Sequence, residues 1–375
     1  MVFLQQVMFS MPKTIKNLVF TACIGLAACG GGQSDRSAVT TPTIPTAPML
    51  RDQTTIPIGV ALAVGSFERA SSIRYSPQAS QLRNLAAHEF SSVVAENVMK
   101  PEFIHPQEDQ YNWSDGDYLV KFAKDNGMQI HGHTLVWHNA IPDWMNNYTG
   151  DWEAMLTDHI TTVVSHYSSD ISSWDVVNEA FLDDGSVRST IWSTHISDYI
   201  AKAYLAAHAA DPDAELYYND YNIEAMPKKL DAVLNMVSDF RNRNIPIDGI
   251  GFQLHIDRYW PSTTQIRQAF SRCVAMGLKV RISELDIRMN PNNTATTLTP
   301  ELAELQRQRY RDVITAYLET VPYDLRGGIT VWGLTDATSW VTGYYHMPDW
   351  PLLFDANFQR KPAWTGMSEA LIATP

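Results

Sequence analysis

Eight apolar, β-branched segments recur along the chain from Ile56 onward, with longer segments of helical spacing between them. Strands that alternate with helices pair in parallel and are joined by right-handed crossovers. Eight repeats of this unit predict a closed (β/α)₈ barrel. The predicted strands are Ile56–Ala63, Ser92–Glu96, Gln129–Val136, Ser173–Asn178, Glu215–Asn219, Ile250–His255, Lys279–Asp286 and Gly328–Trp332.

The helices predicted between these strands include Trp152–Tyr167, Thr194–Asp211, Lys228–Asn244 and Pro300–Thr320, with a last helix at Pro362–Ile372. A doubly wound open sheet is the main alternative to a barrel. That fold usually carries a GxGxxG phosphate loop after its first strand, and the segment Gly59–Gly65 does not have this pattern. Because single α/β barrels commonly reach this length, residues 51–375 are assigned to one (β/α)₈ domain.

The first 28 residues have the pattern of an export signal. Lys13 and Lys16 precede an apolar stretch, Leu18–Ala28, that is too short to span a bilayer as a permanent helix. This stretch ends before Cys29 and is similar to the bacterial lipoprotein box, in which that cysteine is lipidated. An ordinary cleavable signal peptide is the alternative, and Met11 is an alternative start.

Residues 29–50 are rich in Gly, Ser, Thr and Pro, which predicts a flexible tether rather than a domain. An acyl chain on Cys29 would hold an exported protein at a membrane surface, with the outer membrane as the expected place. No second hydrophobic span follows in the sequence.

The charge and cysteine content exclude several classes of partner and bond. The net charge of −13 and the absence of a Lys/Arg cluster argue against binding of nucleic acid or anionic lipid, and a neutral polymer is compatible with them. Cys273 is the one cysteine in the predicted domain, so no internal disulfide is expected there. Its apolar neighbours predict a small buried residue.

Polar and aromatic side chains gather where the predicted strands end. In a (β/α)₈ barrel the carboxyl ends of the strands converge on one mouth, where active sites lie. A functional site is therefore predicted at this mouth. In chain order the strand ends carry Glu96, Asn97, His133, Trp137, Asn178, Glu179, Asn219, Tyr221, Asn222, Gln253, His255, Glu284, Asp286 and Trp332.

Glu179 and Glu284 each end an apolar run typical of a buried strand. A buried carboxylate is unfavourable unless it is paired or functional. Two such groups that face one cleft can cleave a glycosidic bond, with retention at a separation of about 5 Å and inversion at about 6.5–9.5 Å. Glu179 is interpreted as the general acid/base, which requires a raised pKa. The alternative for Glu179 is structural pairing with a lysine or a helix N-terminus.

Glu284 is interpreted as an ionised nucleophile. His255 is the best candidate to hold it by a hydrogen bond, and Asp286 would orient that histidine. The alternative is a buried ion pair between Glu284 and Arg281 or Arg288, which are close in the sequence.

Three tryptophans and one lysine are further binding candidates. Trp137, Trp332 and Trp340 can stack on sugar rings, and the last two flank a segment predicted to be a loop, where exposed tryptophan favours a binding role. Lys100, close to Asn97, can donate to a hydroxyl group, and the alternative is a solvated surface lysine.

His131, His133 and His138 offer a rival chemistry, because His-x-His at a strand end can bind Zn²⁺. Such a site needs three or four converging ligands, and the other histidines lie on predicted helices. For His133, contact with a sugar and a purely structural role remain open alternatives.

Several motifs, in order along the chain, resemble glycoside hydrolase family 10. The resemblance covers the chain from about Ile56 to the C-terminus. The motifs are AENVMK (Ala95–Lys100), GHTLVWH (Gly132–His138), WDVVNEA (Trp174–Ala180), YNDYN (Tyr218–Asn222), QLHI (Gln253–Ile256), ISELDI (Ile282–Ile287), VWGLTDATSW (Val331–Trp340), PLLFD (Pro351–Asp355) and KPA (Lys361–Ala363).

The resemblance implies a retaining β-1,4-xylanase on a (β/α)₈ barrel, with Glu179 as acid/base, Glu284 as nucleophile and no metal or cofactor. Asn178 would bind the 2-hydroxyl group of the sugar under attack, and His255 would hold Glu284 with support from Asp286. Gln253 is a further substrate-binding candidate. The glycone side would be lined by Glu96, Asn97, Lys100, His133, Trp137, Trp332 and Trp340, and the leaving-group side by Tyr221 and Asn222.

Four positions depart from the family pattern. Pro101 stands where tryptophan is usual, His131 where arginine is usual, and Asn139 and Ala140 where serine and glutamine are usual. In the family that glutamine contacts the distal glycone sugar, so these changes affect the outer glycone side and leave the reacting centre intact.

The sequence therefore predicts an exported, lipid-tethered, monomeric endo-β-1,4-xylanase that acts on xylan and xylo-oligosaccharides. Two alternatives from other classes remain. One is a non-catalytic glycan-binding lipoprotein on a degenerate barrel, and the other is the histidine-based metallohydrolase.

Overall fold

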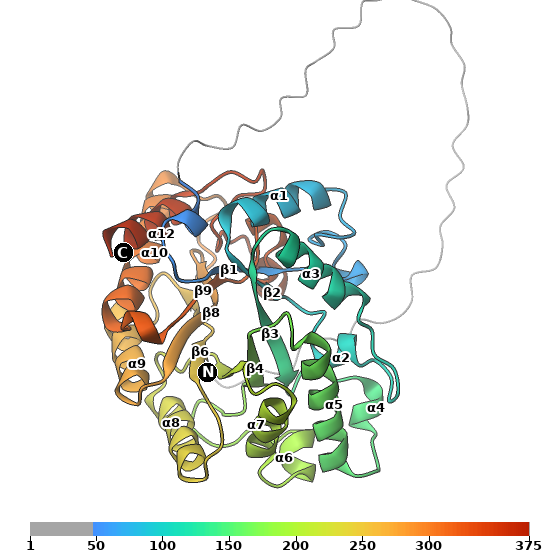
Figure 1. Cartoon of the computed structure of the whole chain (residues 1–375). Coiled ribbons are helices and arrows are strands. Elements are labelled where there is room, and N and C mark those ends of the chain that lie inside the picture. The colour runs from blue at the N-terminus through green and yellow to red at the C-terminus, as the bar shows by residue number, and fades with distance from the viewer. Residues whose placement is uncertain (1–47, 375) are drawn as a thin grey trace, which may run out of the picture. The chain divides into compact units, whose positions relative to one another are not determined.

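Nine β-strands, paired in parallel throughout, form the centre of the part of the chain that the computed structural model describes, residues 48–374 (Figure 1). Strand β6 pairs with both β5 and β8, which closes the sheet into a ring. Strand β7 lies beside β8 directly after β6, so β6 and β7 together occupy one of eight positions. The strands are β1 (Ile58–Leu62), β2 (Ser92–Ala95), β3 (Gln129–Val136), β4 (Ser173–Asn178), β5 (Glu215–Asp220), β6 (Gly249–Phe252), β7 (His255–Asp257), β8 (Lys279–Arg288) and β9 (Arg326–Val331).

Each barrel position is followed by one long helix, and these helices surround the strands (Figure 1). The predicted (β/α)₈ barrel is thus confirmed. The long helices are α1 (Ala79–Glu89), α3 (Ser114–Asp125), α5 (Trp152–Tyr167), α7 (Tyr199–Ala210), α8 (Pro227–Asn242), α9 (Thr263–Ala275), α10 (Pro300–Thr320) and α12 (Pro362–Ala373).

Short helices occupy several connections that lead from a strand end to the next long helix. These connections line the mouth of a (β/α)₈ barrel, so they position the groups around the site. The short elements are α2 (Pro101–Ile104), α4 (Asp143–Asn146), α6 (Ile191–His195), α11 (Trp340–Tyr345) and the 3₁₀ turns η2 (Ser66–Glu68) and η4 (Asp336–Thr338). Two further 3₁₀ turns are η1 (Leu50–Asp52) and η3 (Tyr323–Leu325).

Local capping explains why two predicted helices begin at the predicted residues. The carboxylate of Asp151 accepts from the first free backbone N–H groups of α5, and Thr299 caps α10, whose first residue is Pro300. A side-chain cap satisfies backbone donors that have no partner inside the helix, and proline fits the first helical position. Both helices therefore begin where the sequence predicts.

Two other predictions of local structure were wrong. The helix predicted over Thr194–Asp211 is interrupted, because Asp198 has a left-handed φ of 58° between α6 and α7. The strand predicted over Ile250–His255 is interrupted between β6 and β7, where Leu254 has a φ of 54°. Neither backbone conformation fits the element that the apolar pattern predicts.

Register shifts occur close to the carboxyl ends of several strands. They lie between His133 and Val136, between Asp175 and Val177, and between Ile282 and Leu285. Such irregularities bend a strand and redirect its side chains, and they are common beside active sites. The strands that carry the candidate residues are therefore irregular where those residues lie.

The folded part begins slightly before the predicted boundary. Leu50 is fully buried, and its backbone N–H donates to the carboxylate of Glu89, so the tether predicted over residues 29–50 does not extend to its last residue. The predicted export signal, residues 1–28, and Cys29 lie outside the described residues. Cys273 is buried, as predicted. Between residues 48 and 374, no helix has both the length and the apolar character to span a bilayer.

Candidate active site

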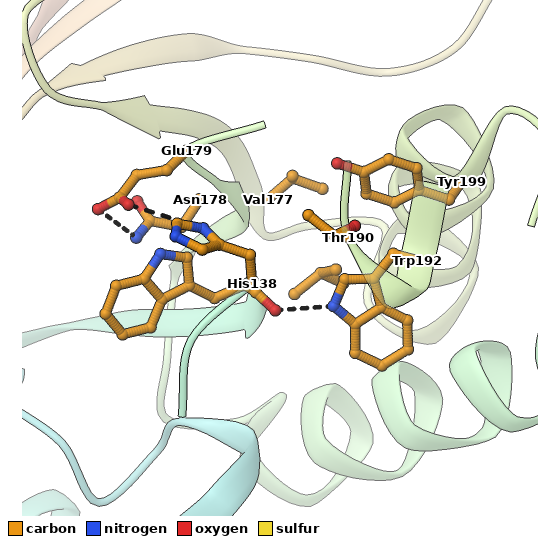
Figure 2. Close-up of a pocket in the computed structure, with 9 residues that line it drawn as sticks. His138, Val177, Asn178, Glu179, Thr190, Trp192 and Tyr199 are labelled. Atoms are coloured by element: carbon orange, nitrogen blue, oxygen red, sulfur yellow. Dashed lines mark hydrogen bonds and ion pairs between the residues drawn. The ribbon is translucent and has the colours of Figure 1, made fainter. Parts of the chain in front are cut away.

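Glu179 and Glu284 both lie almost buried at the same end of the barrel. Glu179 directly follows β4 and is 9% exposed, and Glu284 lies in the second half of β8 and is 5% exposed. Figure 2 shows Glu179 beside Asn178 and His138, on the side of the pocket that lies away from Trp192 and Tyr199. The two carboxylates are thus presented by strands on different sides of one barrel mouth.

Three amide side chains connect the two glutamates. The Nδ2 atom of Asn219 donates to Oε1 of Glu284 at 2.7 Å and to Oδ1 of Asn178 at 2.9 Å. The Nε2 atom of Gln253 lies 3.0 Å from Oε1 of Glu179 and 3.2 Å from Oδ1 of Asn178. A continuous set of hydrogen bonds therefore runs from one carboxylate to the other, and it holds both in defined rotamers.

His255 lies between two carboxylates. Its Nε2 atom is 3.0 Å from Glu284 Oε2 and its Nδ1 atom is 2.8 Å from Asp286 Oδ2, which also accepts from the indole of Trp340 at 2.7 Å. Burial disfavours the charged ring, but the charges and hydrogen bonds of Asp286 and Glu284 prevail and raise the pKa of His255 to about 10. At neutral pH the ring is therefore an imidazolium that donates to both carboxylates. These are the contacts that the sequence analysis expects of His255 and Asp286.

The electrostatics of Glu179 differ from the prediction of a raised pKa. Burial raises the pKa of this carboxyl, but nearby His138 and the hydrogen bond from Gln253 outweigh burial, and the pKa of Glu179 is lowered. His138 lies 3.8 Å from Glu179 Oε2, and burial lowers the pKa of its own ring to about 4. The sequence shows neither neighbour as a partner of Glu179, because both come from other strand ends.

Glu179 also has an unusual backbone conformation. Its φ is 58°, which is in the left-handed region and costs a non-glycine residue about 1–3 kcal/mol. Its N–H donates to the carbonyl of Asn219 at 2.9 Å, and its carbonyl accepts from Nε of Arg188 at 2.9 Å. These bonds hold the strained residue in place and direct its side chain into the mouth.

Glu96, Asn97 and Lys100 form a second cluster of charged and polar groups after β2. Lys100 Nζ donates to Asn97 Oδ1 at 2.9 Å and lies 4.8 Å from the ring centre of Trp137. Lys100 is 7% exposed, so the alternative of a solvated surface lysine is wrong. Burial lowers the pKa of Lys100, although the nearby carboxylates of Glu284 and Glu96 oppose this shift.

A carboxylate that the sequence analysis missed completes this cluster. Glu68, in η2, accepts from Asn97 Nδ2 at 2.7 Å and from the backbone N–H groups of Val64 and Gly65. Burial and the negative charge of Glu68 together raise the pKa of Glu96 to about 8. The signal that could have found Glu68 is its place just after the first strand.

His131 and His133 both face Asp175. The Nε2 atom of His131 lies 3.0 Å from Oδ1 of Asp175, and Nδ1 of His133 lies 2.9 Å from Oδ2. His133 also packs edge-on against Trp332, with ring centres 5.4 Å apart. The structural alternative for His133 thus has defined partners. Among residues 48–374, no group of three or more His, Cys, Asp or Glu is arranged to hold a metal ion.

Two tryptophans follow β9, and one of them is more buried than predicted. Trp332 is 7% exposed and packs against Ala61 and Val94. Its backbone N–H donates to the carbonyl of Leu285 in β8, so Trp332 continues the pairing of β9 and lies inside the barrel wall. Trp340 is half-buried and begins α11. Trp332 is therefore buried at the strand end, whereas an exposed tryptophan beside the loop was expected; its role in sugar binding stays a prediction.

Tyr221 and Asn222 lie after β5 on the side of Glu179. The Tyr221 hydroxyl accepts from Arg188 Nη2 at 2.9 Å. The centre of the Tyr221 ring lies 3.5 Å from Nζ of the buried Lys229. Asn222 donates to Asp183 at 3.2 Å. Sequence reasoning missed Arg188 and Lys229, because they come from a loop and from a helix rather than from a strand end. It also gave Asn219 no role.

The structural alternative for Glu284 is wrong. Arg281 donates to the carbonyl of Gly327 at 3.0 Å and to Thr330 Oγ1 at 2.9 Å. Arg288 lies over the ring of Tyr345, at 3.4 Å from its centre. Both arginines are therefore engaged elsewhere, and the charged partner of Glu284 is His255.

Known proteins share this barrel. The family model described as "Glycosyl hydrolase family 10" matches residues 52–370. The endo-β-1,4-xylanase Xyn10C of Cellvibrio japonicus is 44% identical over 313 residues, which cover 76% of this chain and 52% of that protein. Endo-1,4-β-xylanase B of Thermotoga neapolitana is 38% identical over 299 residues, covering 79% of this chain and 84% of that protein.

A solved structure is also similar. It is a mutant of xylanase 10C from Cellvibrio japonicus in complex with xylopentaose, with a TM-score of 0.83 and 39% identity, and the match covers 88% of this chain and 70% of that one. The chain spans about half the length of the two Cellvibrio japonicus xylanases that it matches, 52% and 55%. Because the family match includes every strand of the barrel and both glutamates, the chain belongs to glycosyl hydrolase family 10.

Proposed function

We propose that this protein is an endo-β-1,4-xylanase that cleaves xylan and xylo-oligosaccharides with retention of anomeric configuration. The observation that carries the proposal is the pair Glu179 and Glu284, linked by shared amides at one barrel mouth. The names of the family relatives and the xylopentaose bound in a similar structure support xylan as the substrate class.

In the first step, a carboxylate oxygen of Glu284 attacks the anomeric carbon while the bond from that carbon to the leaving oxygen breaks. Glu179 delivers its proton to the leaving oxygen, and the sugar becomes a glycosyl ester of Glu284. Asn219 and His255 each hold one oxygen of Glu284, so the nucleophile is oriented before substrate arrives. Asn178 is the candidate for the 2-hydroxyl group of the attacked sugar.

In the second step, Glu179 removes a proton from water, and the resulting hydroxide attacks the same carbon and breaks the ester bond. Two inversions at one carbon give net retention, and both glutamates return to their starting states. The imidazolium of His255 donates to the Glu284 carboxylate in the free enzyme and stabilises that carboxylate when the ester bond breaks.

The proton on Glu179 depends on the substrate. In the free protein the pKa of Glu179 is lowered by His138 and Gln253 against the effect of burial. A bound sugar excludes water from the site, so the negative charge of Glu284 acts on Glu179 with less screening. Loss of water and the nearby negative charge both raise the pKa of a carboxylic acid. We therefore assign the protonated form of Glu179 to the complex rather than to the free enzyme.

Product analysis tests the function. Linear and arabinose- or glucuronate-branched xylans are incubated with the protein, and the anomeric form of the first products is followed by NMR. Release of internal fragments with initial β-configuration supports a retaining endo-xylanase. An initial α-product would overturn retention, and release of single sugars from chain ends would overturn the endo mode.

The same assay separates the other classes. A non-catalytic glycan-binding protein would bind xylan without releasing fragments. A histidine-based metallohydrolase would lose activity after prolonged chelation and dialysis, and recover with added Zn²⁺. Undiminished hydrolysis after chelation is expected from the glutamate pair, because neither proposed step uses a metal.

We further propose that the protein is exported and held at a membrane by an acyl chain on Cys29. The basis is the leader sequence, in which an apolar stretch ends at that cysteine, and the polar segment that follows. Replacement C29A should move the protein from the membrane to the soluble fraction of the producing cell. Membrane retention of the variant at the native level would rule out the acyl anchor.

A further inference from the structure

An exposed pair of stacked phenylalanines lies at the barrel mouth outside the groups described above. Phe67, in η2 after β1, is 54% exposed, and its ring lies parallel to that of Phe103 in α2, with centres 4.3 Å apart and planes within 9°. One face of Phe67 is thus covered by Phe103. Exposure of an aromatic ring to water is unfavourable, and exposed apolar groups of this kind are typical of binding surfaces.

Local contacts fix the turn that carries Phe67. The Glu68 carboxylate closes the turn that carries Phe67 by accepting from the N–H groups of Val64 and Gly65. Phe67 also lies against Gly65, where an added Cβ atom would come within 2.3 Å of its ring. Preorganised aromatic surfaces bind without a large loss of side-chain entropy.

The pair is continuous with the polar cluster after β2. The other oxygen of Glu68 accepts from Asn97 at 2.7 Å, and the backbone N–H of Phe103 donates to the carbonyl of Lys100 at 3.0 Å. Lys100 is in turn close enough to Glu284 to be affected by its charge. The order from the reacting centre outward is therefore Glu284, Lys100 and Asn97, and then the phenylalanines.

We propose that Phe67 and Phe103 form an additional sugar-binding platform, which stacks on a xylose residue of the substrate one position beyond the sugar bound by Asn97 and Lys100. This inference rests on the proposed function. The apolar face of a pyranose ring matches an aromatic face in size, and each ring removed from water contributes favourably. The neighbouring Ala140, whose carbonyl accepts from Glu102 of α2, has no side chain that could bond to a sugar there. The aromatic pair is then the contact for the distal sugar.

Two aryl glycosides with the same leaving group test the platform. In 4-nitrophenyl β-xylobioside two sugars occupy the glycone side, and the trioside adds the distal one. For the native protein, kcat/KM should be higher on the trioside. In F67A the ratio of kcat/KM on the trioside to kcat/KM on the bioside should fall by roughly three- to tenfold, while kcat/KM on the bioside stays near native.

Three further variants make the result specific. F67W keeps an aromatic face and should keep the ratio. G65A displaces the ring of Phe67 and should lower the ratio without removing the ring. Y323A removes an exposed aromatic ring in η3, which precedes β9 at the other end of the barrel, and should leave the ratio native.

The outcomes distinguish this inference from the proposed function. An unchanged ratio in F67A overturns the platform, and so does an equal loss on both substrates, which would mean that Phe67 only supports Asn97. Should the native protein cleave neither glycoside, the proposed function fails. Calorimetric titration with xylohexaose then tests the platform. F67A should bind xylohexaose more weakly than the native protein and Y323A do, and equal affinities would overturn the platform.

Discussion

The Nε2 atom of His255 lies 3.0 Å from the Oε2 atom of Glu284, and the pKa of His255 is raised to about 10. At neutral pH the histidine is therefore a cation, and it donates a hydrogen bond to the carboxylate of the proposed nucleophile. Because Asp286 binds the other ring nitrogen, the position of Glu284 depends on His255 directly and on Asp286 through that histidine.

The raised pKa of His255 predicts a pH-dependent contribution to stability. The ordinary histidine pKa of 6.5 applies to the unfolded chain, so protonated His255 stabilises the fold fully below that pH, and the stabilisation is lost as the pH rises through about 10. Replacement H255N should lower the free energy of unfolding, by a difference from native that shrinks between about pH 7 and pH 10. Urea denaturation at three pH values measures this.

The control for this measurement is H208N, which changes an exposed histidine of α7 and should leave the free energy of unfolding near native at each pH. A difference between H255N and native that stays constant from pH 7 to pH 10 would contradict the ion-pair origin of the pKa shift.

Removal of the proposed nucleophile, Glu284, should abolish turnover. E284A is expected to reduce kcat on xylan on the order of 10⁴-fold or more, because the ester of the first proposed step forms on this carboxylate. Azide can enter the space left by the carboxylate, and its single inversion should give the α-glycosyl azide, detectable by NMR. E301A, which changes an exposed glutamate of α10, is the matched control and should keep native kcat. Near-native turnover by E284A would refute the assignment.

The effect of removing the proposed acid/base, Glu179, should depend on the leaving group of the substrate. In E179A the first step should remain fast for substrates such as dinitrophenyl xylobioside, whose leaving oxygen needs little protonation, whereas xylan hydrolysis should nearly cease. Pre-steady-state kinetics should show a burst of released phenol followed by slow hydrolysis of the glycosyl ester. Equal losses on good and poor leaving groups would contradict this role.

The hydrogen bond from Gln253 to Glu179 predicts a shift in the pH profile. It favours the ionised carboxylate, so Q253M should raise the pKa of Glu179 and move the basic limb of kcat/KM upward by as much as about one pH unit. In the native enzyme the basic limb should lie at higher pH for kcat than for kcat/KM, because kcat reports the complex.

A surface change provides the control for this profile. Q308M, on the exposed side of α10, should leave both limbs at their native positions. A Q253M profile that coincides with the native profile would mean that Gln253 does not influence the proton on Glu179.

The barrel was predictable because its signals are local. Helices α5 and α10 begin and end as the sequence predicts, since a cap and the apolar spacing lie within the segment itself. The interruption before α7 and the break between β6 and β7 were not predicted. Both depend on single residues with positive φ, Asp198 and Leu254; aspartate is enriched in this conformation but usually adopts others, and leucine gives no signal of it.

The candidate site was predictable in its composition but not in its electrostatics. The chain order of polar strand ends was enough to predict that Glu179, Glu284 and His255 lie together, because parallel strands bring these ends to one mouth. The lowered pKa of Glu179 was not foreseen, since it arises from Gln253 and His138. These neighbours meet only when β4, the end of β3 and the segment after β6 close around the barrel axis.

The sequence by itself determined the alternation of strands and helices, the two glutamates and the family, because each of these is written in short contiguous motifs. Only the tertiary structure decided that Trp332 is buried, that Glu68 joins the cluster around Asn97, and that Phe67 stacks on Phe103. The physical reason is that burial, hydrogen bonds and charge interactions act over a few ångströms in space. The groups they join here come from different strands and loops, which the folded backbone alone brings together.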